Sequence, residues 1–142
     1  MSKVNPYLNF HGNTEDAFNF YKSVFGGEFV MLQRFKETPH GDTMSATDKE
    51  KIMHIALPIG EGTILMGTDT LDSMGQTLTV GNNFSFAITP ESEDQANTYF
   101  KALVDGGKVV MPMEKAFWGA YFGMLVDKFG IQWMVNYETK EK

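Results

Sequence analysis

A chain of 142 residues that is 42% hydrophobic and 13% aromatic can build a packed interior, which excludes a disordered protein. Its net charge of −6 repels phosphate groups, so neither nucleic acid nor an anionic membrane is an expected partner. The lack of cysteine excludes disulfides, thiolate catalysis and cysteine-bound metal centres.

The chain begins with no apolar run of signal-peptide length, and no stretch reaches the ~18 apolar residues of a membrane span. We therefore expect a cytoplasmic protein. The first predicted element is a strand over residues 4–10, in which Leu8 and Phe10 alternate with Tyr7 and Asn9. Alternation places these two pairs on opposite faces of a sheet.

A helix is predicted after this strand. Apolar residues recur at helical spacing from Ala17 to Phe25, on a face that includes Phe20, with Asn13 as the N-cap and Gly26 at the end. A polar segment later in this half is expected to be a mobile loop over residues 36–51. Three further strands are expected, over residues 28–35, 53–59 and 63–68, the last two forming a hairpin.

The same order of elements recurs about eighty residues later. A strand is predicted over residues 83–88, and the next helix begins after Ser92, which forms a capping box with Gln95. Three more strands are expected, over residues 109–113, 120–126 and 131–136. Identical residues lie 80 positions apart at Phe20 and Phe100, Val24 and Val104, Gly26 and Gly106, and Met31 and Met111.

This pattern indicates a duplicated unit, with internal repeats over residues 3–68 and 83–137, a linker over 69–82 and a solvated tail at 140–142. The predicted class is α+β, with two tandem βαβββ units in a single domain over residues 1–142. Each half is too small to bury much core by itself. We expect the two sheets to form a half-barrel around a shared cleft, with the helices on the outer face, and we take that cleft as the ligand site.

Several segments of the chain resemble a known superfamily. They are residues 6–13 (PYLNFHGN), 17–21 (AFNFY), 117–119 (FWG), 122–123 (FG) and 127–134 (DKFGIQWM). Over almost its whole length the chain resembles the vicinal oxygen chelate superfamily of glyoxalase I, extradiol dioxygenases and bleomycin-resistance proteins, and within it the PhnB-like branch. The resemblance implies the paired-unit fold and a homodimer. Such sequences are often described as 3-demethylubiquinone methyltransferases, but no glycine-rich nucleotide loop opens a helix here.

In metal-using relatives, four ligands come from the first and last strands of each unit. Strand alternation places these positions near Asn5, Met66, Asn83 and Met134 in this chain. A divalent ion needs carboxylate or imidazole ligands, whereas thioethers are soft and neutral. We therefore predict no metal at the shared site and no cofactor.

His54 is the histidine within a predicted strand, on the opposite face from Met53 and Ile55. Pointing into the cleft, it would serve as a general base near neutral pH; the alternative is a hydrogen-bonded structural histidine. His11 and His40 are expected in turns. The aspartates at the start of the linker, Asp69 and Asp72, would be either an acid–base pair or turn residues, and turn residues are the commoner case.

Aromatic and thioether side chains favour a planar or aliphatic organic ligand, and neutral polar groups would orient it by hydrogen bonds. For each aromatic or thioether residue, an ordinary core role is the alternative and the commoner case. Trp133 is a further aromatic candidate for the cleft wall. The predicted ligand-binding residues are Asn5, Tyr7, Asn9, Met66, Asn83, Ser85, Trp118, Tyr121 and Met134.

Three functions follow from these residues. The first is a metal-independent small-molecule binding protein that sequesters or carries its ligand, as bleomycin-resistance proteins do. The second is a lyase or isomerase with His54 as base and Asn5 or Asn83 polarising an oxygen. The third is a structural or interaction domain with a filled cleft. The orientation of His54 separates them, because a base must face the cleft and have a polar partner.

Overall fold

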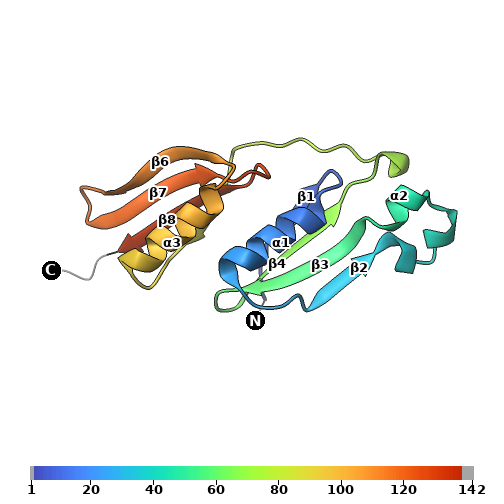
Figure 1. The fold of residues 1–142 in the computed structure, drawn as a ribbon, viewed down its shortest axis with the longest axis horizontal. Coiled ribbons are helices and arrows are strands. Elements are labelled where there is room, and N and C mark those ends of the chain that lie inside the picture. Colours follow the sequence, from blue (N-terminus) through green and yellow to red (C-terminus); the bar gives the residue numbers. More distant parts are fainter. Residues whose placement is uncertain (1, 139–142) are drawn as a thin grey trace. The chain divides into compact units, whose positions relative to one another are not determined.

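The computed structural model describes residues 2–138, so the predicted tail at 140–142 lies outside the described residues. The chain divides into two compact units at the bond between Thr79 and Val80. Each unit contains one strand, one long helix and three further strands, in that order (Figure 1). The predicted α+β class with two tandem βαβββ units is confirmed.

The first unit is a four-stranded mixed sheet with the spatial order β1-β4-β3-β2. The edge strand β1 runs parallel to β4, and the other neighbours are antiparallel. The predicted loop contains a short helix and two 3-10 turns. The elements are β1 (Tyr7–Phe10), α1 (Thr14–Phe25), β2 (Met31–Arg34), the 3-10 turns Phe35–Glu37 and Gly41–Thr43, α2 (Ala46–Lys49), β3 (Ile52–Ile59) and β4 (Thr63–Asp69).

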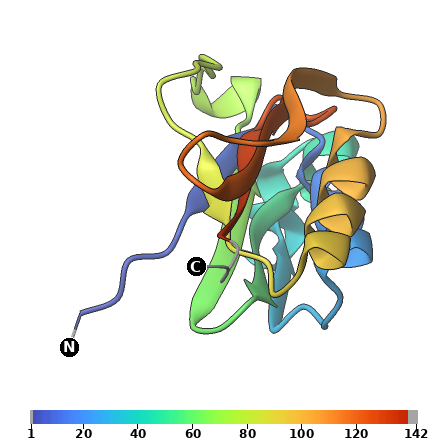
Figure 2. The same cartoon turned by 90° about the vertical axis from the view of Figure 1, so that its left-hand side faces the viewer.

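Helix α1 lies along one face of this sheet (Figures 1 and 2). Ala17, Phe18 and Tyr21 are fully buried in that interface. Phe18 is central: a Cβ atom at Gly67 would stand 2.7 Å from its ring, so only glycine in β4 admits it. The predicted helix face was therefore wrong in one respect, because Phe20 is only half-buried and Phe18 takes its place.

The second unit has the equivalent spatial order β5-β8-β7-β6. The predicted cap of its helix is confirmed, since the Ser92 side chain accepts a hydrogen bond from the Gln95 backbone N–H at 3.0 Å. The chain reaches this unit through a 3-10 turn at Asp72–Met74. The elements are β5 (Phe86–Ile88), α3 (Glu93–Val104), β6 (Lys108–Lys115), β7 (Ala120–Val126) and β8 (Gln132–Glu138).

The two long helices correspond at an offset of 79 residues, because α1 begins at Thr14 and α3 at Glu93. The predicted match of Phe20 with Phe100 at 80 residues is therefore wrong. Tyr21 is the counterpart of Phe100, and both are buried. Within residues 2–138, none of the helices is long and apolar enough to cross a bilayer.

Candidate functional site

In the first unit, the sheet face turned away from α1 carries a group of polar and thioether side chains. Leu8 and Phe10 are buried on the helix side, so the alternating residues Tyr7 and Asn9 point the other way. We call the face away from α1 the first distal face. Its residues come from three neighbouring strands and are Tyr7 and Asn9 of β1, His54 of β3, and Met66 and Thr68 of β4.

Tyr7 and His54 form a hydrogen-bonded pair on this face. The Tyr7 hydroxyl lies 3.0 Å from His54 Nδ1, and the two rings stack with centroids 5.6 Å apart at 26°. Partial burial raises the pKa of the Tyr7 phenol, against a smaller opposing effect of a hydrogen bond with Thr68. The phenol is therefore protonated at neutral pH, and His54 presents Nε2 as its remaining polar atom.

The other polar residues predicted for the site do not lie together on one face. Asn5 has a structural contact, since its Oδ1 accepts a hydrogen bond from the Ile64 backbone N–H at 3.0 Å. Asn9 is exposed on the first distal face. Asn83 and Ser85 precede β5, because that strand begins three residues later than predicted. Of these four, only Asn9 shares a strand and a face with Tyr7.

In the second unit, Met134 lies on the face away from α3, which we call the second distal face. Trp118, in the turn before β7, stands edge-on to Phe122 with ring centroids 5.9 Å apart. Tyr121 and Trp133 lie on the opposite, helix-covered side. The Tyr121 hydroxyl donates to Asn97 Oδ1 of α3 at 2.7 Å, and Trp133 is only 2% exposed. The expectation that these two residues line a cleft is corrected accordingly.

Asp69 is a buried structural carboxylate that sequence reasoning mistook for a linker residue. It ends β4, is 2% exposed, and accepts hydrogen bonds from the Thr14 backbone N–H, the Thr14 hydroxyl and the Ile52 backbone N–H. The predicted capping residue, Asn13, makes no side-chain cap. Asp69 therefore caps α1 from another strand, while Asp72 lies outside with an 81% exposed side chain beside His11.

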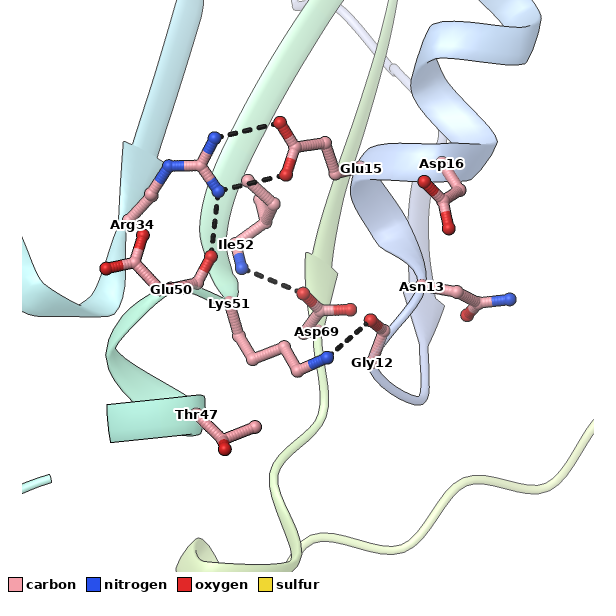
Figure 3. Close-up of a pocket in the computed structure, with 10 residues that line it drawn as sticks. All are labelled: Gly12, Asn13, Glu15, Asp16, Arg34, Thr47, Glu50, Lys51, Ile52 and Asp69. Carbon is pink, nitrogen blue, oxygen red and sulfur yellow. Dashed lines mark hydrogen bonds and ion pairs between the residues drawn. The ribbon is translucent and has the colours of Figure 1, made fainter. Parts of the chain in front are cut away.

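A cavity of about 540 Å³ opens at the N-terminal end of α1 within the first unit (Figure 3). Its two cationic side chains bind protein oxygens: Arg34 holds both carboxylate oxygens of Glu15 at 2.8 and 3.0 Å, and Lys51 donates to the Gly12 carbonyl at 2.9 Å. Arg34 also donates to the Glu50 carbonyl oxygen at 2.8 Å. These contacts connect α1 and the loop before it to β2 and to the start of β3, and they leave Asp16 as an exposed carboxylate of the lining. Because the cations are already engaged with protein oxygens, the cavity is mainly a structural junction.

The ion pair in this cavity gives a pH-dependent prediction. The hydrogen bond from Arg34 lowers the pKa of Glu15 below its ordinary value of 4.5, against the effect of burial. Its stabilising effect is present above pH 4.5 and is lost as the pH falls through the lowered pKa. Because the Glu15 side chain is 43% exposed, we expect Glu15→Gln to cost only about 0.5 kcal/mol at pH 7.

Urea unfolding at pH 7 and at pH 3 measures this cost. The difference between wild type and Glu15→Gln should be smaller at the lower pH, where Glu15 begins to be protonated. A loss of stability that is equal at both pH values would contradict the assignment to the ion pair. The same substitution at the more exposed Glu61, in the hairpin turn, is the control and should change neither value.

No three His, Asp or Glu side chains converge to hold a metal ion anywhere in residues 2–138. At the predicted ligand positions, Met66 and Met134 point to the two distal faces, and Asn5 is engaged with β4. These neutral side chains are poor partners for a divalent cation.

Comparison with known proteins finds relatives that match the chain over nearly its full length. Residues 2–136 match a family model described as 3-demethylubiquinone-9 3-methyltransferase. Protein YjdN of Escherichia coli strain K12 is 28% identical over 141 residues, which cover 94% of this chain and 93% of that protein.

Solved structures of other proteins also match this chain over nearly its full length. Protein PA1353 from Pseudomonas aeruginosa is 36% identical, with a TM-score of 0.84 over 97% of this chain and 98% of its own. The PhnB protein from Bacillus cereus is 28% identical, with a TM-score of 0.78 over 96% and 99%. A glyoxalase-related enzyme from Fulvimarina pelagi, 17% identical over 97% of this chain and 89% of its own, shares the fold at a TM-score of 0.62.

Proposed function

We propose that this chain, which belongs to the PhnB-like family described as 3-demethylubiquinone-9 3-methyltransferase and has the vicinal oxygen chelate fold, binds a small organic molecule without a metal ion. The ligand contacts the first distal face. It stacks on or beside the Tyr7 ring and forms a hydrogen bond with His54.

The observation that carries this proposal is the Tyr7–His54 pair on a face that α1 leaves free. A core histidine would be enclosed, whereas His54 is half-buried and Tyr7 is 45% exposed. Because Nδ1 is bound to Tyr7, the ring is held in one orientation with Nε2 available. Met66 beside the pair adds a deformable apolar surface, which suits a planar organic ligand.

Two further points support binding without a metal or a methyl donor. The first distal face carries uncharged amide, hydroxyl and thioether side chains around the Tyr7–His54 pair, and Glu114, opposite Phe122, is a single carboxylate on the second. The described part of the chain brings together no ligand set for an ion. The sequence also has no glycine-rich loop of the Rossmann type, so the methyl transfer in the family's description is not part of this proposal.

A thermal-shift screen of planar phenols, quinones and aromatic acids, each with and without EDTA, tests the proposal. A ligand at 100 times its dissociation constant should add about 2.7 kcal/mol of stability, and the shift should not depend on EDTA. We expect His54→Gln to weaken the best ligand roughly threefold to tenfold, the value of one neutral hydrogen bond.

His40→Gln is the matched control, because His40 is exposed in the loop between β2 and α2 and contacts neither Tyr7 nor His54. Ligand affinities that are equal in wild type and His54→Gln would refute the assigned face. Parallel variants at Met66 and Met134 test the predicted shared cleft: losses from both would mean that both units contribute to binding.

A second candidate function, a lyase or isomerase with His54 as general base, is favoured by the same hydrogen bond, because a base needs an orienting partner. Incubation of the best ligand with protein in D2O separates the two functions. Loss of a ligand C–H signal by NMR, abolished in His54→Gln, supports catalysis. An unchanged spectrum supports binding alone. The homodimer and the cytoplasmic location stay predictions.

A further inference from the structure

The two sheets can be compared position by position through their hairpins. Met66 pairs with Ala56 in the first hairpin, and Met134 pairs with Met124 in the second. Each methionine follows its partner by ten residues, so the two methionines occupy matching positions on their distal faces. The two registers then match the neighbouring positions of the two sheets. Phe122 occupies the position of His54, Asn136 that of Thr68, and Ala87 that of Tyr7.

This comparison shows that the distal faces differ in chemistry. The second has an aromatic ring in place of the histidine, and the exposed Ala87 has no ring at the position of Tyr7. The second distal face is therefore no copy of the Tyr7–His54 site. Any ligand it takes must be recognised by other groups.

The aromatic side chains of this face form a partly exposed series. Trp118 stands edge-on to Phe122 at 5.9 Å and to Phe117 at 5.1 Å. Trp118 remains 56% exposed, although its ring is held against Phe122. An exposed aromatic ring packed on one neighbour offers its remaining surface for stacking with another flat ring.

Asn136 supplies a polar group beside these rings. It is the cross-strand neighbour of Phe122 on β8, whereas Glu114 is the neighbour on β6 and is exposed. Its Oδ1 is shielded from solvent and accepts no hydrogen bond. Among the described residues, it is the one buried side-chain polar atom without a hydrogen-bond partner. At the matching position of the first sheet, the Thr68 hydroxyl is satisfied by the Met53 carbonyl at 2.7 Å. An unmet buried acceptor lowers stability, and such groups in native proteins call for an explanation.

We propose that the second distal face is a binding subsite for a flat aromatic molecule that carries an N–H or O–H donor. The ring of the molecule packs on Trp118 and Phe122, and its donor binds Asn136 Oδ1. This subsite shares no residue with the first distal face. The proposal therefore does not depend on whether the Tyr7–His54 pair binds a ligand.

Indole and 1-methylindole test this subsite, because they have the same flat ring and only indole has an N–H donor. Titration of each into the ¹⁵N-labelled chain is followed by the Asn136 side-chain amide and the Trp118 indole signals. We expect indole to shift both signals and to bind roughly threefold to tenfold more tightly than 1-methylindole.

Asn136→Leu should abolish the preference for indole while leaving the melting temperature equal or higher, since the unmet acceptor is removed. Trp118→Leu should weaken both probes. Phe84→Leu is the control, because Phe84 is 60% exposed and packs on Phe86 instead. Equal binding of the two probes to wild type, or no change at Trp118 and Asn136 with either, would overturn the proposal.

Discussion

Replacement of Asp69 by alanine is expected to lower the free energy of unfolding by about 3–4 kcal/mol. The carboxylate is 2% exposed and accepts three hydrogen bonds, at 3.0 and 2.7 Å from Thr14 and 2.8 Å from the Ile52 N–H. Alanine leaves these donors buried without an acceptor, and each unmet donor is costly. The substitution also removes a negative charge from the N-terminus of α1, where it interacts favourably with the helix dipole.

Urea denaturation, with hydrogen exchange of the α1 amides, measures this effect. Asp69→Asn should lose less, since its Oδ1 can still accept from Thr14. Asp72→Ala is the matched control three residues along, and its 81% exposed side chain predicts a change under about 0.5 kcal/mol. If Asp69→Ala and Asp72→Ala are equally stable, the bridging role of Asp69 is wrong.

The second large effect is expected at Asp127, which organises the turn between β7 and β8. Its Oδ1 accepts from the backbone N–H groups of Phe129 and Ile131 at 2.8 and 3.1 Å, and its Oδ2 accepts from Trp133 Nε1 at 2.8 Å. The side chain is buried with Trp133. We expect Asp127→Ala to cost about 2–3 kcal/mol, because it leaves a buried indole N–H and a tight turn without their acceptor.

Near-UV circular dichroism reports this loss directly, because Trp133 is held by the same carboxylate. The signal should weaken in Asp127→Ala, and the α3 amides should exchange faster than those of α1. Asp105→Ala, an exposed position at the end of α3, is the control and should leave both unchanged. An unaltered Trp133 signal in Asp127→Ala would contradict this account.

Sequence reasoning succeeded where the signal is local. Alternation within a strand correctly placed Leu8 and Phe10 on the opposite face from Tyr7 and Asn9, and His54 on the face away from Ile55. Turn glycines located both hairpins, and Ser92 located the start of α3. Each of these predictions depends only on residues a few positions apart, which is the range over which backbone periodicity and capping act.

Sequence reasoning failed where the partner of a side chain lies far away along the chain. Asp69 binds Thr14, 55 residues away, so a local reading saw only a carboxylate at the end of a strand. Tyr121 was misplaced because the register of β7 is set by its neighbours, and a shift of one position moves a side chain to the other face. The Phe18 site depends on the missing side chain of Gly67 in another strand.

The parallel pairing of β1 with β4 has a consequence for how the chain matures during synthesis. Strand β1 leaves the ribosome before the other strands of its unit, yet among the described residues it pairs with β4, the last strand of that unit, where Tyr7 is opposite Met66. Closing so long a loop is slow compared with forming α1 or the β3–β4 hairpin. The nascent strand must therefore wait unpaired, and the ring of Tyr7 reaches His54 only when translation of the first unit is complete.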